Sequence, residues 1–212
     1  HRPNRRQRQM CIRDRSYAYG APKTKKKFKI AAVDFGIKEN ILRIMKDMGG
    51  DITVMPPTTT AKEMAALKPD GIFLSNGPGD PKVLTSAVEE VKQMMKLEIP
   101  IFGICLGHQI MSLAYDLKIE KMPFGHHGAN HPVHDLKNNT VFITSQNHNF
   151  AVANIEDRSD VVVTHKSLFD GSIQGIEHND KPFYSIQCHP EASPGPKEFE
   201  VLFERFFEDM NA

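Results

Sequence analysis

The sequence predicts an α/β domain with a mostly parallel central sheet, helices on both faces and additional antiparallel strands in the second half. Short apolar runs alternate with segments of helical periodicity between residues 28 and 114, which is typical of βαβ units. From residue 141 onward the apolar runs are joined by turn residues instead. The 212 residues, 40% of them hydrophobic, suffice for one such core. We expect one domain over residues 28–212 and a basic, non-globular extension over residues 1–27.

The first half is expected to contain four buried strands, each a short apolar run bounded by turn or charged residues. They lie at residues 28–33, 51–55, 71–74 and 99–104. Between them, apolar side chains at helical spacing predict helices over 40–48, 61–67 and 84–95, and a further helix from near residue 107. Thr60 and Glu63 form a capping box that opens the second helix.

The second half is expected to contain four more strands, at residues 141–144, 160–165, 173–177 and 183–187. The chain then ends in a helix with apolar side chains at i, i+3, i+4, i+7, i+8 and i+11. This stripe predicts core packing and not a ligand site; it consists of Phe199, Leu202, Phe203, Phe206, Phe207 and Met210.

Positive charge is concentrated in the first 27 residues, which hold ten of the 27 Lys and Arg residues and one acid, Asp14. The remainder carries an excess of eight acidic residues, although the formal net charge is +1. Such a body has no general attraction to phosphate backbones, and no apolar run approaches the roughly 18 residues of a membrane helix. We expect neither nucleic acid nor a membrane as partner. The extension is interpreted as an artefact, a linker or, given its Arg-rich start, a mitochondrial targeting segment.

Cysteine usage indicates a reducing compartment. Cys11, Cys105 and Cys188 are odd in number and show no CxxC spacing, so the sequence predicts neither a disulfide framework nor a zinc site. We expect a cytoplasmic protein, with mitochondria as the alternative.

The strongest local signal for chemistry surrounds Cys105. A buried strand leads into this cysteine, which Gly103 and Gly107 flank and a helix follows. This is the strand–turn–helix setting of a nucleophile elbow, where a helix N-terminus favours the thiolate. A small buried hydrophobic side chain is the alternative, but the two glycines favour the nucleophile.

A cysteine nucleophile needs a base, and the base needs an orienting partner. His189 and Glu191 follow a predicted strand, with Pro190 fixing the backbone between them. Gly77 and Gly79 lie in a rigid loop after another strand, where backbone N–H groups can face a developing oxyanion. A plain turn or a phosphate-binding loop is the alternative for this loop.

Together these motifs resemble the class I (triad) glutamine amidotransferases. The segments at 34–42, 124–132, 145–152 and 190–196 are similar to the glutaminase domain of carbamoyl-phosphate synthase small subunits. The resemblance covers about residues 28–210. It implies a flavodoxin-like fold, glutamine as substrate, Cys105 as nucleophile, His189 as general acid/base and Glu191 as its orienter.

The resemblance also implies a glutamine pocket and a partner. Backbone N–H groups of Gly77 and Leu106 would form the oxyanion hole, and the glutamine contacts would be Gly79, Gln109, Asn147, Asn149 and Phe150. Ammonia would pass through a tunnel to a large synthetase subunit, in a heterodimer or higher oligomer, that uses ATP, bicarbonate and Mg²⁺. The domain itself would need no cofactor and no metal.

The sequence departs from the family pattern in two ways. Asn149 stands where the family usually has Gly, although Asn tolerates positive φ better than most residues. In the family, the small subunit has a further N-terminal domain that supplies a Ser to the pocket, so we expect this chain to be a fragment. An end just after the last helix favours a large subunit on a separate chain.

Other interpretations remain open. The histidines at 126, 127, 131 and 134 have spacings that allow metal ligation, but we expect surface or polar packing. Cys188 is expected to point away from His189. The alternatives for function are the glutaminase of another amidotransferase, such as anthranilate synthase or GMP synthase, and a non-catalytic regulatory module. Segments 124–132 and 145–152 argue against the former, and the intact triad argues against the latter.

Overall fold

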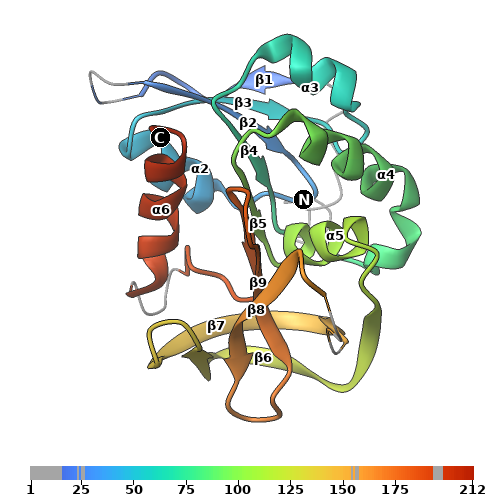
Figure 1. Ribbon diagram of the computed structural model, residues 1–212. Helices are drawn as coiled ribbons and strands as arrows, with labels where there is room; N and C mark the ends of the chain where they lie inside the picture. Colours follow the sequence, from blue (N-terminus) through green and yellow to red (C-terminus); the bar gives the residue numbers. More distant parts are fainter. Residues whose placement is uncertain (1–15, 23, 25–26, 154, 156–157, 193–197) are drawn as a thin grey trace, which may run out of the picture.

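The computed structural model describes residues 16–22, 24, 27–153, 155, 158–192 and 198–212, whose strands form one ten-stranded mixed sheet (Figure 1). Its order is β1-β3-β2-β4-β5-β10-β9-β7-β6-β8. Five neighbouring strands pair in parallel: β2 (Phe28–Val33), β3 (Gly50–Met55), β4 (Gly71–Leu74), β5 (Ile101–Ile104) and β10 (Phe183–Ile186). The other five pair antiparallel: β1 (Tyr17–Ala18), β6 (Ile119–Asp135), β7 (Thr140–Val152), β8 (Val161–Ser167) and β9 (Ile173–His178).

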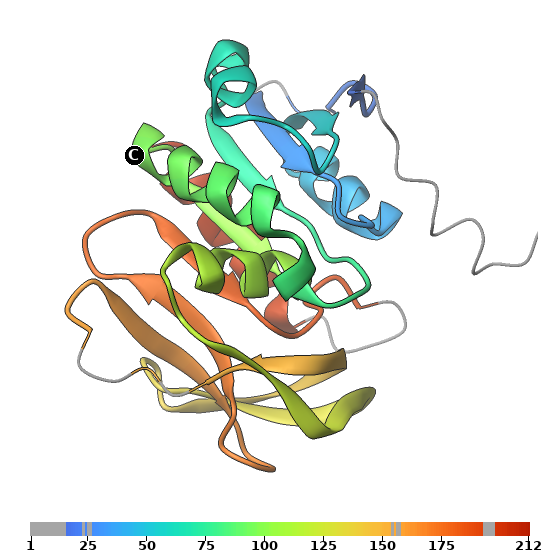
Figure 2. The ribbon, with the colours of Figure 1, turned by 90° about the vertical axis from the view of Figure 1, so that its right-hand side faces the viewer.

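Helices cover both faces of the parallel half, as predicted. On one face α2 (Glu39–Asp47) and α6 (Val201–Asp209) pack on β2, β3, β4 and β5. On the other face lie α3 (Ala61–Leu67), α4 (Thr85–Met94) and α5 (Leu106–Ala114); Figure 2 shows α4 and α5 side by side. Single turns of 3-10 helix occur at η1 (Pro81–Val83), η2 (Met95–Leu97) and η3 (Glu198–Glu200).

Several elements confirm the sequence patterns closely. Strands β2 and β4 have the expected bounds, and the capping box forms, with Thr60 Oγ1 accepting from the Glu63 backbone and Glu63 Oε2 from that of Thr60. The C-terminal apolar stripe packs in the core: Phe203 and Phe206, on the sheet-facing side of α6, are fully buried. Phe102 of β5 makes edge-to-face contact with Phe203, at a ring-centroid distance of 5.5 Å.

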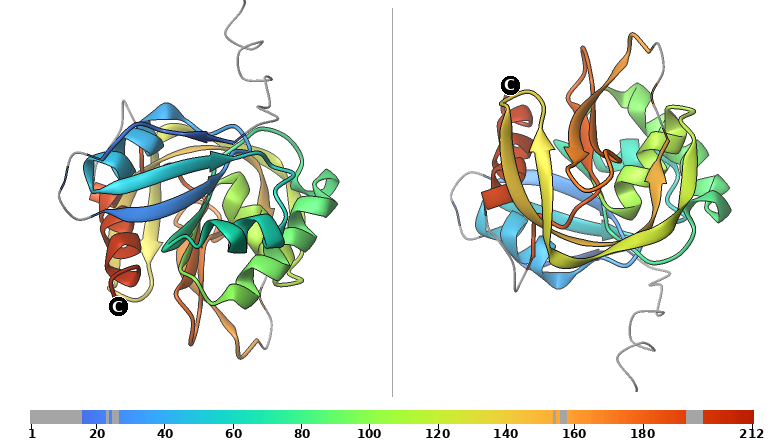
Figure 3. Two further views of the ribbon diagram at one scale, coloured as in Figure 1. Left: turned by 90° about the horizontal axis from the view of Figure 1, so that it is seen from above. Right: turned by 90° about the horizontal axis from the view of Figure 1, so that it is seen from below.

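The expectation of a mostly parallel sheet needs correction, because the antiparallel strands are as numerous as the parallel ones in the described part of the chain. The main reason is the ribbon of β6 and β7, which lies at the lower end of the molecule in Figure 1 and faces the viewer in the right-hand view of Figure 3. The sequence patterns predicted no strand at β6 and only four residues of β7. Strand β6 contains Pro123, Gly125, Gly128 and Pro132, which are breakers in local propensity but occur here in a ribbon with two register shifts.

The boundary at residue 27 also needs correction. Residues 17 and 18 form β1, which pairs with β3, and Tyr17 and Tyr19 pack against the α2–α6 side of the core. Tyr17 and Tyr19 therefore belong to the globular part. Residues 1–15, which include Cys11 and most of the basic residues of the extension, lie outside the described residues.

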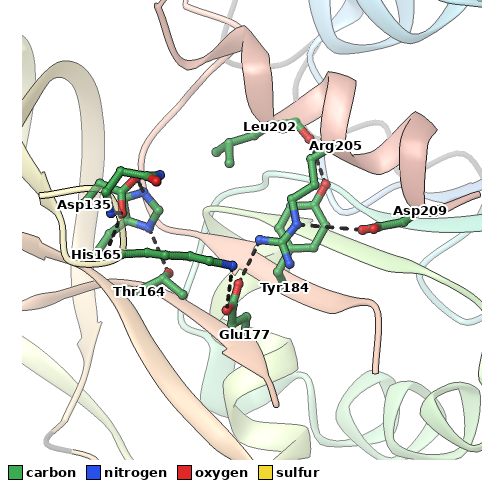
Figure 4. Close-up of polar contacts among 10 residues, drawn as sticks. Asp135, Thr164, His165, Glu177, Tyr184, Leu202, Arg205 and Asp209 are labelled. Atoms are coloured by element: carbon green, nitrogen blue, oxygen red, sulfur yellow. Dashed lines mark hydrogen bonds and ion pairs between the residues drawn. The ribbon is translucent and has the colours of Figure 1, made fainter. Parts of the chain in front are cut away.

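A polar cluster joins the last helix to the sheet (Figure 4). The guanidinium of Arg205 lies 4.1 Å from the ring centroid of Tyr184, and its Nη1 is 2.8 Å from Glu177 Oε2. Tyr184 donates its hydroxyl proton to the carbonyl of Leu202 at 2.7 Å. Because Tyr184 is on β10 and Glu177 on β9, this cluster fixes α6 across the junction of the parallel and antiparallel halves.

Candidate active site

A cleft of about 1150 Å³ lies where the loops after β2, β4, β5 and β10 meet. The carboxyl ends of parallel strands are where ligand sites form in open α/β sheets. The segment 147–150 of β7 closes the cleft from the antiparallel half. Predicted site residues that line it are Gly77, Gly79, Cys105, Gln109, Asn147, Asn149, Phe150 and His189.

Cys105 stands on a strained turn between β5 and α5. Its φ of 53° and ψ of −102° place it outside the helical and extended regions, in a conformation that is costly for a residue with a Cβ. The backbone holds it there from both sides. Cys105 N donates to the carbonyl of Ile186 on β10 at 2.9 Å, and Cys105 O accepts from Gln109 N at 3.1 Å. The expected elbow is therefore present.

The glycines around the elbow are required by close packing. A Cβ on Gly107 would lie 2.1 Å from the carbonyl oxygen of Leu74, and one on Gly77 would lie 2.2 Å from that of Phe35. The first turn of α5 thus rests directly on the end of β4. Leu106 begins this helix, so its N–H belongs to the turn that has no intrahelical acceptor. This position is suited to an oxyanion-hole donor.

The side chains of His189 and Glu191 are both buried and form a hydrogen bond with each other. His189 Nδ1 lies 2.9 Å from Glu191 Oε1, and their side chains are 4% and 1% exposed. The backbone supports the pair: His189 N donates to Ser145 O on β7, and Asn40 Nδ2 donates to Glu191 O. Cys105 lies close enough to His189 to raise the pKa of the imidazole, and both residues line the same cleft. The three predicted triad residues therefore come together.

The electrostatics of the site favour the charged forms of His189 and Glu191. Burial by itself lowers the pKa of His189, but the hydrogen bonds and charges of Cys105 and Glu191 outweigh it and raise the pKa to about 9. Burial raises the pKa of Glu191, yet His189 and Lys38 together hold it below its usual value. An imidazolium beside a carboxylate is thus the stable form at neutral pH, ready to donate a proton to a leaving group.

Lys38 was not among the predicted site residues, although it contacts the trio. Its Nζ lies 2.9 Å from Glu191 Oε1 and 3.1 Å from His189 Nδ1. Two hydrogen bonds to the loop after β4 hold the loop that carries Lys38: Lys38 N donates to Asn76 Oδ1, and Asn76 Nδ2 donates to Gly36 O. Because an ammonium group only donates, its favourable contact is with the carboxylate. The available signals were its place after the first predicted strand and within the segment 34–42 that resembles the family.

Replacing Lys38 by Met should lower glutaminase kcat/KM about three- to tenfold, because buried Glu191 keeps only His189 as a charged partner. The effect is moderate since the Lys38 side chain is 46% exposed. Steady-state kinetics check this, with Lys62→Met on α3 as the control. Equal kcat/KM in the Lys38 variant and the control would contradict a role of Lys38 in holding the carboxylate.

The expected glutamine contacts differ in how firmly they are held. Gln109 Nε2 donates to Phe150 O and to Gln187 Oε1, each at 3.0 Å, so the side chain of Gln109 joins α5 to β7 and to the segment after β10. Asn147 and Asn149 are exposed on β7. Gly79 has a φ of +106° and open space around its Cβ position. All of these lie on the same cleft as Cys105, although their roles stay predictions.

Cys188 does not line the cleft. Strand β10 ends at Ile186, so Cys188 lies in a bend and not in the strand from which its orientation was predicted. It is fully buried in the apolar cluster beneath α6, and burial raises the pKa of its thiol well above the usual value. Its surroundings therefore do not favour a thiolate.

Replacing Cys188 by Ala should lower the free energy of unfolding by about 1 kcal/mol through the small space it leaves, while glutaminase kcat/KM stays within twofold of wild type. Chemical denaturation and steady-state kinetics measure the two quantities. A loss of turnover without a loss of stability would show that Cys188 takes part in the chemistry.

The histidine-rich segment forms polar packing. His126 and His131 are buried, with ring centroids 5.0 Å apart, and His126 is also 5.0 Å from His148. His126 Nε2 lies 2.9 Å from Asp170 Oδ2. Burial lowers the pKa of His148 to about 4. Among the described residues, no three His, Cys, Asp or Glu side chains are placed to share a metal ion.

Comparison with known proteins agrees with this geometry. Residues 31–209 match the family described as glutamine amidotransferase class-I. Two solved structures share the fold: a GMP synthase subunit from Thermoplasma acidophilum (TM-score 0.77, 23% identity, covering 89% of this chain and 96% of that one) and a glutamine amidotransferase from Thermotoga maritima (TM-score 0.67, 14% identity, covering 86% and 97%). The chain therefore belongs to the class I glutamine amidotransferase family.

Within this family, the chain is similar to proteins named carbamoyl phosphate synthase small chain. It is 53% identical to the one from Haemophilus ducreyi over 185 residues, which are 87% of this chain and 48% of that protein. It is 54% identical to the one from Photorhabdus laumondii over 195 residues, which are 90% and 50%. The chain spans about half the length of the curated relatives it matches. No helix in its described part is long and apolar enough to cross a membrane.

Proposed function

We propose that this chain hydrolyses glutamine to glutamate and ammonia, as the glutaminase part of a carbamoyl-phosphate synthase. The observation that carries the proposal is Cys105 on a strained elbow in the same cleft as His189, whose Nδ1 is 2.9 Å from a buried carboxylate, Glu191. A nucleophile, a base and an orienting group in this order are the requirement for acyl transfer through a covalent intermediate.

In the proposed reaction the Cys105 thiolate attacks the side-chain carboxamide carbon of glutamine. The oxyanion that forms faces the N–H groups of Gly77 and Leu106. The C–N bond breaks as the His189 imidazolium donates its proton, so ammonia leaves and a γ-glutamyl thioester remains on Cys105. Neutral His189 then takes a proton from water, whose hydroxide attacks the thioester and releases glutamate and the thiolate.

The choice of partner rests on the names of the relatives and on the resemblance of the sequence. We propose that the consumer of ammonia is a large synthetase subunit, in a heterodimer or a higher oligomer. That large subunit would bind and use ATP, bicarbonate and Mg²⁺, and this domain would bind none of them. A cytoplasmic location is part of the same proposal.

The test is glutamate release by the chain, measured alone and with a large synthetase subunit, bicarbonate and MgATP. We expect slow hydrolysis by the chain alone and faster hydrolysis in the complex, because full alignment of the triad on binding would avoid wasteful ammonia release. Carbamoyl phosphate should form only in the complex. Hydrolysis that is equally fast with and without the subunit would contradict the partner, and no hydrolysis in either state would contradict the reaction.

A further inference from the structure

His127 joins two residues of the cleft although it does not line the cleft itself. Its Nδ1 lies 2.9 Å from Asn147 Oδ1, and its Nε2 lies 3.2 Å from Asn149 Oδ1. Both asparagines line the same cleft as Cys105, and His127 does not. Strands β6 and β7 place the three residues together, since His127 is the register partner of Asn147.

The two neighbouring histidines of β6 have different surroundings. His126 is buried against His131 and His148, whereas His127 is exposed on the opposite side of the strand. His127 therefore lies outside the buried group of histidines. It contacts the exposed side of β7, which carries Asn147 and Asn149.

The backbone leaves room for this arrangement at Gly125. A Cβ there would lie 2.3 Å from Asn149 Oδ1 and 2.6 Å from His127 Nε2. Any larger residue would therefore push the Asn149 carboxamide away from the imidazole. A register shift of the ribbon between Lys121 and His126 brings Gly125 to this position.

In the described part of the chain, the side chains of Asn147 and Asn149 have no other hydrogen bond. Each is exposed, so without His127 each would sample several rotamers. Imidazolium donates from both ring nitrogens, and a neutral ring makes the same two contacts if one carboxamide turns its Nδ2 toward the bare nitrogen.

We propose that His127 is a positioning residue, which holds the carboxamides of Asn147 and Asn149 in the orientation that binds the amino-acid end of the substrate. The inference rests on the proposed glutaminase function. It predicts an effect on substrate binding and not on the chemical step, because the hydrogen bonds of His127 go to Asn147 and Asn149 and not to Cys105, His189 or Glu191.

His127→Ala should raise the KM for glutamine about three- to tenfold and leave kcat within about twofold, as expected when binding contacts common to ground state and transition state are loosened. The matched control is His134→Ala. His134 is also on β6 and lies 3.0 Å from an asparagine, Asn139 Oδ1, but it does not line or contact the cleft. Its KM should equal that of wild type.

A double-mutant cycle with Asn149→Ala tests the route of the effect. If His127 acts through the asparagines, the rise in KM caused by His127→Ala should be smaller in the Asn149→Ala background than in wild type. Equal rises in the two backgrounds, or a His127→Ala variant with unchanged KM, would overturn the proposal. Thermal unfolding of all variants separates a general loss of stability from a change in the pocket.

Alkylation of Cys105 distinguishes failure of this inference from failure of the proposed function. A chloroketone analogue of glutamine should label Cys105 more slowly in His127→Ala than in wild type, whereas iodoacetamide, which has no amino-acid end, should label both at the same rate. Equal labelling by the chloroketone overturns the role of His127. No labelling of wild-type Cys105 by the chloroketone would instead overturn glutamine as the substrate.

Discussion

Replacing Cys105 by Ser is expected to reduce glutamine hydrolysis by about 10³-fold or more, because a neutral hydroxyl is a far weaker nucleophile than a thiolate on this elbow. The backbone conformation at φ 53° and the two bonds that hold residue 105 do not involve sulfur, so the fold should persist. Steady-state glutamate release measures the loss, and circular dichroism with thermal unfolding checks the fold.

The control for this variant is ammonia supplied from outside. In complex with a large synthetase subunit, the Cys105→Ser protein should still permit carbamoyl phosphate synthesis from added ammonium, because only the source of ammonia is removed. Residual glutaminase activity within tenfold of wild type would contradict the assignment of Cys105 as nucleophile.

The second large effect is expected at His189. His189→Asn should lower kcat/KM by about 10³-fold, since both proton transfers lose their donor and acceptor. The wild-type protein should also show a kcat/KM that is level through neutral pH and falls above about pH 9, where the pKa of His189 lies and the imidazolium loses its proton. The variant should lack that basic limb.

The raised pKa of His189 also makes the stability of the fold depend on pH. Because the pKa of His189 is raised from 6.5 to about 9 in the folded state, its stabilising contribution is complete below about pH 6.5 and is lost as the pH rises through 9. The stability of wild type relative to His189→Asn should therefore decline between pH 7 and 10 in denaturant titrations. A pH-rate profile with its basic limb below pH 7 would show that the imidazolium is not the stable form.

The elbow and the His189–Glu191 pair were accessible from the sequence because each consists of neighbours along the chain. Cys105 lies between a buried strand and a helix, and His189 and Glu191 are two residues apart. Their meeting depends on β5 and β10 being parallel neighbours, with Ile104 opposite Ile186. Local patterns do not specify that pairing; the resemblance to the family supplied only the grouping of the three residues as a triad.

Features that depend on contacts between distant segments were missed. Strand β6 has two prolines and two glycines, so its local propensity opposes a strand, and only pairing with β7 makes it one. Lys38 reaches Glu191 because the loops after β2 and β4 are bonded to each other. His127 contacts Asn147 and Asn149 through the register of the β6–β7 ribbon. No spacing in the sequence indicates these contacts.

The most direct test of Cys105 as the nucleophile is capture of the covalent intermediate. Wild-type protein is mixed with glutamine, quenched in acid during turnover and digested, and the peptides are analysed by mass spectrometry. We predict one γ-glutamyl group on Cys105, none on Cys188, and no adduct in the Cys105→Ser variant. Steady hydrolysis of glutamine with Cys105 unmodified, or with the γ-glutamyl group on Cys188, would contradict the proposed mechanism.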